Sequence, residues 1–318
     1  MKRNFSLFLK KNHTISYSKK SYNNKLGVLV SLLNLNLKSE YAIFEIGTNN
    51  FGEIKNLTKI LTPQEIFITN IQSTHLENFK SKKNIAKEKS DIFNSKFNRQ
   101  RKKIYLNITN QSEKIILEKA CNEKLLKIIN IDGKNKYFIK DILKVNNYYE
   151  IYFSINKKLI IIKVNLIIMF RIINLLFCYA FFNENDLDLN DISKRYKYLK
   201  PVVGRGLINQ IKLNKKKIRI IDESYNANPD TMIQSINYYN EIKINFNRKI
   251  LILGNMNELG KNVEKMHLKL LNFVNKFNFK MIILCGEFFR RPIKKIINPK
   301  NEFIYLNNSI EIMNHLIK

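Results

Sequence analysis

Acidic and amide side chains are concentrated in one segment, Ile220-Ile-Asp-Glu-Ser-Tyr-Asn-Ala-Asn-Pro-Asp230. The apolar residues from 218 to 221 predict a buried strand, and Pro229 favours the first turn of a helix. Where a strand leads into a helix in an open α/β sheet, free backbone N–H groups and the helix dipole attract phosphate. The segment is therefore a candidate nucleotide site, and the alternative is a simple turn, which Asn and Asp also favour.

Two further side chains, Glu45 and His75, lie at or after the ends of predicted strands. Glu45 is part of the apolar run Tyr41-Ala-Ile-Phe-Glu-Ile-Gly47, and His75 follows Ile66-Phe-Ile-Thr-Asn70. Burying an unpaired carboxylate in a parallel strand is costly unless a cation receives it. Mg²⁺ takes one or two protein groups and completes its shell with water and phosphate oxygens. The pair therefore indicates a shared metal, although a histidine in such a place is more often a surface or core residue.

Predicted helices and strands alternate along most of the chain. Residues 103–168 differ, since short β-rich runs alternate there with polar turns, as in partly antiparallel strands. Lys200-Pro-Val-Val-Gly-Arg-Gly206 has the composition of a linker. The pattern predicts an α/β protein with two domains, residues 1–200 and 201–318. Helices are predicted over residues 4–10, 84–93, 171–182, 189–199, 229–242 and 263–277, together with one helix that ends at residue 33 and one that begins near residue 309. Strands are predicted over residues 41–47, 66–70, 218–221, 249–254 and 281–285.

The composition excludes several classes of protein. The 318 residues carry 56 basic and 26 acidic side chains, a formal charge of +30. The lysines are scattered through every segment rather than gathered into a patch, which argues against nucleic-acid binding, and Lys82 and Lys83 are expected on the solvated surface. Three distant cysteines without a C-x-x-C spacing indicate neither disulfides nor zinc and suggest a reducing cytoplasm. Neither a signal peptide nor a membrane-spanning run is expected.

The motifs, taken in order, resemble those of the Mur ligase family, closest to its MurF branch. The segment from 220 to 230 matches D-[DE]-S-Y-N-A-N-P of that family nearly letter for letter. Further matches are Asn23, Asn24 and Gly27 in N-x-N-N-x-x-G-V, Glu45 in E-[LIM]-G-x-N-x-x-G-E-I, His75 in N-x-x-x-x-H-L-E, Lys89 in A-K-x-K-x-x-I-F, Asn174 in the adenine-side helix, Arg205 in P-x-x-G-R, and Glu258 and His267 in G-D-M-x-E-L-G-…-H.

The resemblance implies a P-loop-type central domain followed by a Rossmann-like C-terminal domain. It also implies an ATP-dependent ligase with Mg²⁺ that adds D-alanyl-D-alanine to UDP-N-acetylmuramoyl-tripeptide through an acyl phosphate. Such an enzyme is a cytoplasmic monomer of peptidoglycan precursor synthesis, and so of cell-wall biogenesis, cell shape and cell division. The implied roles are metal binding for Glu45, His75 and Lys89, the last as a carbamate; catalysis for Lys89, Arg205 and Asp222; nucleotide binding for Asn174, Arg205, Asp222, Tyr225, Asn226 and Asn228; and substrate binding for Asn23, Asn24, Asn49 and Glu258.

The chain also departs from the family. Asn50 and Asn255 stand where relatives have His and Asp, and Phe170-Arg171 replaces a His-Asn pair beside the adenine. No G-x-x-G-K-[TS] phosphate loop is present, and we expect a chain truncated at both ends relative to the family. Three hypotheses stay open: a MurF-type ligase, or the larger piece of one whose loop comes from a separate polypeptide; an inactive remnant or scaffold; and a folylpolyglutamate-synthetase-like relative. The run from Ser224 to Pro229 argues against the last.

Overall fold

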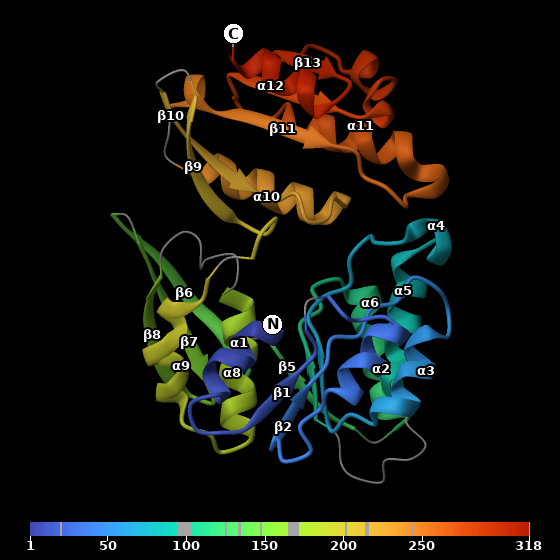
Figure 1. Cartoon of the computed structure of the whole chain (residues 1–318), viewed down its shortest axis with the longest axis vertical. Helices are drawn as coiled ribbons and strands as arrows, with labels where there is room; N and C mark the ends of the chain where they lie inside the picture. Colours follow the sequence, from blue (N-terminus) through green and yellow to red (C-terminus); the bar gives the residue numbers. More distant parts are fainter. Residues whose placement is uncertain are drawn as a thin grey trace. The chain divides into compact units, whose positions relative to one another are not determined.

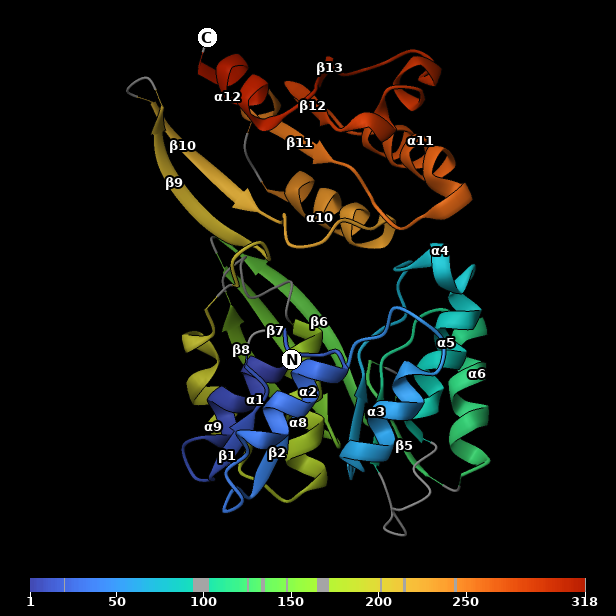
Figure 2. The same ribbon diagram turned by 45° about the vertical axis from the view of Figure 1, so that its right-hand side comes forward.

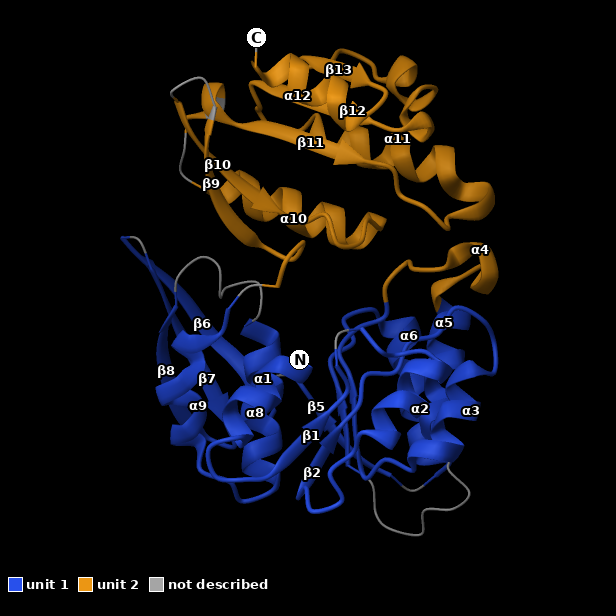
Figure 3. Cartoon of the chain, in the orientation of Figure 1, with its two compact units in different colours: residues 1–71, 83–201 blue, residues 72–82, 202–318 orange. Residues whose placement is uncertain are grey.

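The chain forms two compact units in a computed structural model, coloured separately in Figure 3. Unit 1 comprises Met1–Ile71 and Lys83–Pro201, and unit 2 comprises Gln72–Lys82 and Val202–Lys318. Residues 72–82 thus group with the later part of the chain, whereas the division expected from the sequence put them in the first domain; that division stays a prediction. The structure describes residues 1–19, 21–93, 103–124, 126–132, 135–146, 148–164, 172–200, 202–213, 216–242 and 245–317.

Unit 1 contains two pieces of parallel sheet between two groups of helices (Figure 1). Strand β1 (Ile15–Tyr17) pairs with β2 (Tyr41–Ile43), and β3 (Glu65–Ile68), β4 (Lys103–Leu106) and β5 (Lys127–Asn130) form the second piece. On one side lie α1 (Lys2–Leu9), α8 (Ile172–Glu184) and α9 (Leu189–Arg195), and on the other α2 (Lys25–Leu33), α3 (Glu53–Leu61), α5 (Lys82–Ser90) and α6 (Gln111–Asn122).

An antiparallel sheet and a buried helix complete unit 1. Strands β6 (Tyr137–Val145), β7 (Tyr148–Ile155) and β8 (Lys158–Val164) pair in sequence order. Every second side chain of β7 is buried, as expected for a sheet with one face on a core. These side chains pack with α8, in which every residue from 175 to 182 is buried. The apolar run from 172 to 182 is therefore a core helix, and no described helix is long and apolar enough to cross a membrane.

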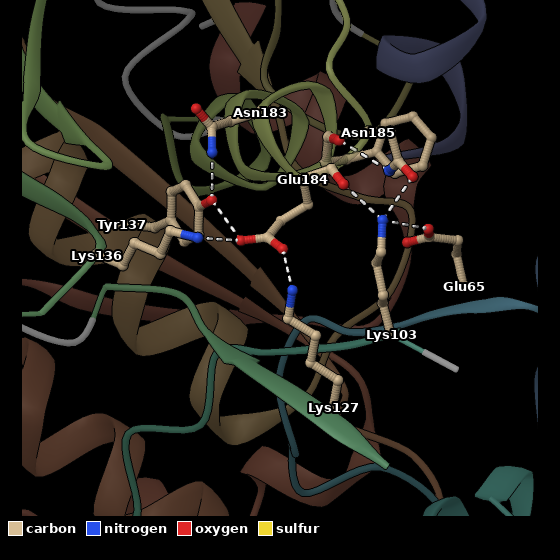
Figure 4. Close-up of polar contacts among 9 residues, drawn as sticks. Glu65, Lys103, Lys127, Lys136, Tyr137, Asn183, Glu184 and Asn185 are labelled. Carbon is tan, nitrogen blue, oxygen red and sulfur yellow. Dashed lines mark hydrogen bonds and ion pairs between the residues drawn. The ribbon is translucent and has the colours of Figure 1, made fainter. Parts of the chain in front are cut away.

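A polar network joins the end of α8 to the β3–β4–β5 sheet and to the antiparallel sheet (Figure 4). The Glu184 carboxylate, only 4% exposed, accepts hydrogen bonds from Lys127 Nζ at 2.6 Å, Lys136 Nζ at 2.6 Å and Tyr137 OH at 2.7 Å. Lys103 Nζ donates to the carbonyl oxygen of Glu184 at 2.5 Å, where a cation stabilises the end of a helix. Desolvation opposes ionisation of Glu184, but the lysines and the tyrosine outweigh it and lower its pKa to about 2.

Unit 2 combines a hairpin with a small parallel sheet (Figure 2). Strands β9 (Leu207–Leu213) and β10 (Lys216–Asp222) pair antiparallel, whereas β11 (Ile250–Gly254), β12 (Met281–Cys285) and β13 (Phe303–Leu306) are parallel. Helices α10 (Pro229–Glu241), α11 (Val263–Val274) and α12 (Ser309–Ile317) alternate with these strands, and the short α4 (Leu76–Phe79) also belongs to this unit.

The predicted α/β class is confirmed, and several local predictions need correction. The strand at 218–221 is not buried: Ile218 and Ile220 are 36% and 41% exposed, because β10 belongs to a hairpin and pairs with no described strand of the parallel sheet. Helix α6 was missed within a region expected to be β-rich, and β9 and β13 were also missed. Phe170 and Arg171 lie outside the described residues.

We expect Glu184→Gln to lower the free energy of unfolding by about 2 kcal/mol at neutral pH, because charge-assisted hydrogen bonds to two lysines become weaker. Since the folded pKa lies below the ordinary value of 4.5, this stabilisation is present above pH 4.5 and is lost as the pH falls towards 2. Urea unfolding at several pH values measures it. Glu118→Gln, which removes an i,i+4 pair with Lys114 at 3.7 Å, should cost under about 0.5 kcal/mol. Equal costs for the two variants would contradict the role given to Glu184.

Candidate functional site

Two of the matching segments meet in unit 1, at the loop that follows β2. The backbone N–H of Gly47 donates to the carbonyl oxygen of Asn23 at 2.8 Å. A Cβ added at Gly47 would lie 2.8 Å from the side-chain nitrogen of Asn23, so only glycine fits there without a shift. Asn24 caps α2, since its side-chain oxygen accepts from the N–H of Gly27 at 2.8 Å. Asn23 therefore contacts the loop that follows β2, and Asn24 caps the helix that begins beside it.

Glu45 occupies a different environment from the one expected. Strand β2 ends at Ile43, so Glu45 lies beyond the strand, and its side chain is 44% exposed rather than buried. Its carboxylate lies 3.6 Å from Lys2 Nζ, which also donates to Ser18 Oγ at 3.1 Å. The argument that burial demands a cation was therefore wrong. An exposed carboxylate at the end of a parallel strand is still a suitable ligand for a hard cation.

The loop from 48 to 54 is held by Glu88, which sequence reasoning did not single out. Glu88 is 2% exposed, and its carboxylate accepts from the N–H groups of Gly52 at 2.7 Å and Ile54 at 2.9 Å and from Thr48 Oγ1 at 3.2 Å. These donors include N–H groups at the start of α3 that have no acceptor within the helix. A carboxylate at this position stabilises the helix, because it accepts from these groups and faces the positive end of the helix dipole. The N–H of Asn49 donates to Glu53 at 2.7 Å. The candidate substrate residue Asn49 thus lies on an ordered loop.

Lys89 follows Glu88 on α5 and is half-buried. Its Nζ lies 3.3 Å from the carbonyl oxygen of Asn70, just after β3. Desolvation lowers the pKa of Lys89. A lysine with a lowered pKa has a larger neutral fraction, and the neutral amine is the form that reacts with carbon dioxide. Asn174, the candidate adenine contact, lies partly exposed in the first turn of α8.

In unit 2, the Asp222 carboxylate accepts hydrogen bonds both from the linker and from the loop after β10. Its Oδ2 accepts from the N–H of Gly204 at 3.0 Å, and its backbone oxygen accepts from the N–H of Gly206 at 2.8 Å. Its Oδ1 accepts from the hydroxyl of Ser224 at 2.6 Å and from the N–H of Ser224 at 3.1 Å. The Ser224 hydroxyl, the Ser224 N–H and then the Gly204 N–H lower the pKa of Asp222. Asp222 therefore orders two loops and stays ionised.

The linker also brings Arg205 onto Tyr225. The guanidinium carbon lies 4.1 Å from the centroid of the Tyr225 ring, within cation–π range. The N–H of Tyr225 donates to the carbonyl oxygen of Gly204 at 3.0 Å, which fixes the register of the two segments. A guanidinium is a permanent cation with a planar fork of donors, which matches the geometry of phosphate. Of the other candidates, Asn226 is exposed, whereas Asn228 is 3% exposed and caps α10 in a capping box with Thr231.

His75 and Glu258 contact each other in unit 2. His75 Nδ1 lies 2.6 Å from Glu258 Oε2, and the N–H of Glu77 donates to the backbone oxygen of Glu258 at 2.9 Å. Both residues have positive φ, 52° for His75 and 62° for Glu258, so both lie in tight turns. With Nδ1 engaged, Nε2 is the ring nitrogen that remains for a ligand.

His267 fixes the loop that carries Glu258. It is fully buried; Nε2 accepts from the N–H of Met256 at 3.1 Å, and Nδ1 lies 2.7 Å from the carbonyl oxygen of Val263. Because Nε2 accepts, the ring is neutral with its proton on Nδ1. Burial lowers the pKa of His267, against the opposing effect of the Val263 carbonyl. The histidine of the matching motif therefore has a structural explanation.

Asp230 is a second residue that the sequence did not single out. Its carboxylate lies 2.9 Å from Lys82 Nζ and accepts from the N–H of Ser73 at 2.8 Å. Desolvation opposes its ionisation, but Lys82 and Ser73 together lower the pKa of Asp230. The contact anchors the segment that bears His75 to the start of α10. Lys82 is consequently part of an ion pair, rather than the merely solvated residue that was expected.

The three predicted metal ligands are divided between the two units. Glu45 and Lys89 belong to unit 1 and His75 to unit 2. Within the described residues, no group of three or more His, Cys, Asp or Glu side chains could hold a metal ion. Mg²⁺ needs fewer protein groups, because it keeps several waters and binds phosphate oxygens. The exposed Glu45 suits that cation, and the three-residue site stays a prediction.

A hollow of about 270 Å³ in unit 1 lies at the carboxyl ends of β4 and β5 and contains none of the predicted residues. Its position is one at which α/β sheets bind ligands. The lining includes Leu106, Asn107, Gln111, Lys114, Asn130 and Asp132.

Comparison with known proteins gives a consistent result. Residues 2–182 match the family described as Mur ligase middle domain. The UDP-N-acetylmuramoyl-tripeptide–D-alanyl-D-alanine ligase of Rickettsia prowazekii (strain Madrid E) is 29% identical over 328 residues, covering 99% of this chain and 69% of the relative. The chain spans between 55% and 69% of the length of the first three curated relatives.

Solved structures share the fold. MurF from Acinetobacter baumannii matches with a TM-score of 0.78 at 20% identity, covering 99% of this chain and 73% of that chain. MurF ligase from Thermotoga maritima in complex with ADP matches with a TM-score of 0.76 at 17% identity, covering 99% of this chain and 76% of that chain.

Two glycines of the linker should differ in how much stability is lost when each is replaced by alanine. Gly204 and Gly206 both have positive φ, 72° and 77°, which costs an L-residue about 1–2 kcal/mol. A Cβ at Gly204 would also lie 2.8 Å from the backbone nitrogen of Tyr225, whereas at Gly206 it would meet only the flexible Glu223 side chain at 3.1 Å. In urea unfolding, Gly204→Ala should cost about 1 kcal/mol more than Gly206→Ala. Indistinguishable costs would show that the close approach of Gly204 to Tyr225 is not a constraint.

The buried His267 predicts a loss of stability in mild acid. Its folded pKa lies below the ordinary value of 6.5, so the unfolded chain binds more protons as the pH falls below that value. The free energy of unfolding should therefore fall between pH 7 and pH 5, and His267→Gln should fall less steeply. Urea unfolding across this range measures both slopes. Parallel slopes for the two proteins would contradict a buried neutral His267.

Proposed function

The chain belongs to the Mur ligase family, as its motifs predicted, and from this premise we propose that it serves in the ATP-dependent addition of D-alanyl-D-alanine to UDP-N-acetylmuramoyl-tripeptide. Relatives that bear this name cover nearly all of the chain. The observation that carries the proposal furthest is Lys89, half-buried with a lowered pKa beside the end of β3, where the family motif requires a reactive lysine.

Two substitution steps make up the reaction. A terminal carboxylate oxygen of the tripeptide bonds to the γ-phosphorus of ATP, the bond from that phosphorus to ADP breaks, and an acyl phosphate results. The amine nitrogen of D-alanyl-D-alanine then bonds to the carbonyl carbon; the carbon–oxygen bond to phosphate breaks, and the amine loses a proton. Both steps concentrate negative charge on phosphate oxygens, so positioning and charge stabilisation are the main demands on the protein.

The residues of unit 2 suit nucleotide binding. Arg205, stacked on Tyr225, presents a cation for phosphate oxygens. Asp222 holds the linker and the loop from 222 to 226 together and keeps a carboxylate beside them. Asn226 is exposed, whereas the side-chain oxygen of Asn228 is used by the cap of α10, which makes Asn226 the better candidate for direct contact.

Glu45, His75 and Lys89 are the residues that would hold Mg²⁺. When bound, the cation would neutralise charge on the transferring phosphoryl group. Lys89 would act after its neutral amine has bonded to carbon dioxide and lost a proton, which converts it into a carbamate anion. Glu258, bound to His75 Nδ1, would fix the orientation of the imidazole so that Nε2 faces its ligand.

The absence of a G-x-x-G-K-[TS] run from the sequence favours a second candidate function, in which the chain binds ligands without catalysing the reaction. Without those backbone donors and that lysine, affinity for ATP phosphates should be lower. A separate polypeptide carrying the loop would restore them. The two functions therefore differ in whether such a polypeptide confers activity.

The test is phosphate release from ATP in the presence of the tripeptide nucleotide and D-alanyl-D-alanine. We expect release that depends on both substrates, from the chain alone or after addition of a polypeptide with the phosphate loop. Lys89→Arg should reduce it about 100-fold, because a guanidinium cannot form the carbamate. Lys87→Arg, at an exposed position of the same helix, should leave it unchanged. No release under either condition would establish the inactive alternative.

A further inference from the structure

The hollow at the carboxyl ends of β4 and β5 has a side-chain amide on each of these two strands. Asn130 is the last residue of β5, and Asn107 directly follows β4. Leu106 is in register with Asn130, and its carbonyl oxygen accepts from the N–H of Ile131 at 2.7 Å. The strands are therefore still paired where the hollow begins, at the edge of a parallel sheet where α/β proteins bind ligands.

Most polar side chains that line the hollow have no partner within the protein. Lys114 Nζ lies 3.7 Å from Glu118 Oε1, which is beyond ordinary hydrogen-bond distance. Among the described residues, four of the lining residues take part in no side-chain hydrogen bond: Asn107, Thr109, Gln111 and Asn130. A ligand could therefore bond to these groups without breaking a contact of the folded chain.

Asp132 adds a carboxylate to the lining of the hollow. Its φ is 62°, a conformation that Asp adopts more readily than most residues. Its N–H donates to the carbonyl oxygen of Tyr137 at 2.8 Å, and its Oδ1 accepts from the N–H of Ile139 at 3.4 Å. The start of β6 thus fixes the position of Asp132, while Oδ2 accepts no hydrogen bond from the described part of the chain.

The lining groups match one nucleobase better than the others. Leu106, Ile108 and Ile131 offer apolar surface for a flat ring. A lysine or a side-chain amide can donate to the adjacent acceptors O6 and N7 of guanine. A carboxylate can accept from two adjacent donors, and a guanine nucleotide presents such a pair in N1–H and the 2-amino group. The bases of adenine, cytosine and uracil nucleotides have no such pair.

We propose that this hollow binds the base of a guanine nucleotide. Its volume of about 270 Å³ is close to the lower end of the range of about 300–1,000 Å³ for small-molecule sites, which suits a base with part of its sugar. The hollow shares no residue with the proposed ATP site, so its occupant is an additional ligand and not the phosphate donor. The inference does not rest on the proposed ligase function, and either can fail without the other.

The experiment titrates the full chain with GMP, AMP and IMP in a calorimeter. All three nucleotides carry the same phosphate, so attraction of that group to a chain of formal charge +30 is the same for each. We expect GMP to bind about tenfold or more tightly than AMP, and also than IMP, which lacks the 2-amino group. Hydrogen exchange should show that GMP protects residues 107–114 and 130–132.

Asp132→Asn tests the carboxylate. The variant keeps a side-chain oxygen for the N–H of Ile139 and a residue that tolerates a positive φ, but it no longer accepts from two donors. We expect its affinity for GMP to fall about tenfold and its affinity for AMP to stay the same. Asp141→Asn makes the same change of charge at an exposed position of β6 outside the hollow and should leave GMP binding unchanged. Urea unfolding of both variants checks that they fold.

Several outcomes would overturn the proposal. Equal affinities of the unaltered chain for the three nucleotides would mean that a basic surface attracts the phosphate alone, and this comparison does not depend on any variant. Protection of residues 202–206 and 222–226 in place of the hollow would assign GMP to unit 2. Unchanged GMP binding by Asp132→Asn, or an equal loss in Asp141→Asn, would show that Asp132 does not contact the base. No binding at millimolar GMP would show that the hollow is not a guanine site.

Discussion

The loops that carry the candidate ligands are held by side chains that accept hydrogen bonds from loop N–H groups. Such loops lack the regular bonds of helices and strands, and a buried N–H without a partner is costly. Glu88 holds the loop after β2, Asp222 holds the linker, Asp230 holds the segment before His75, and His267 holds the loop before Glu258. The three carboxylates and the neutral imidazole thus set the positions of most of the predicted ligands.

Several residues of the motifs have a structural role that explains their presence without any ligand. Asn24 and Asn228 cap helices, Gly47 and Gly204 permit close approaches of the chain, and His267 satisfies a buried N–H. Among the described residues, fewer structural contacts account for Glu45, Lys89 and Asn226. The candidate chemistry therefore depends on these residues more than on the rest of the motif.

The sequence predicted the fold class and the kinship with MurF, because apolar periodicity and motif order are local signals. It placed β12 correctly and the ends of most helices within a few residues. The sequence did not predict interactions between residues that lie far apart along the chain. Glu88 and Asp230 bond to groups 36 and 157 residues away, and Glu184 meets Lys127 57 residues away. Glu45 was wrongly placed in a buried strand, because β2 ends at Ile43, four residues before the end that the apolar pattern indicated.

We propose that the anchored loops of this chain respond to ATP, and that this response depends on Mg²⁺. Hydrogen exchange with and without ATP, in the presence and absence of Mg²⁺, tests it directly. We expect slower exchange in the loops at 45–54, 202–206 and 222–226 with ATP and Mg²⁺ together, and a smaller effect with ATP alone. Unchanged exchange in all three loops, or protection that is the same without Mg²⁺, would contradict it.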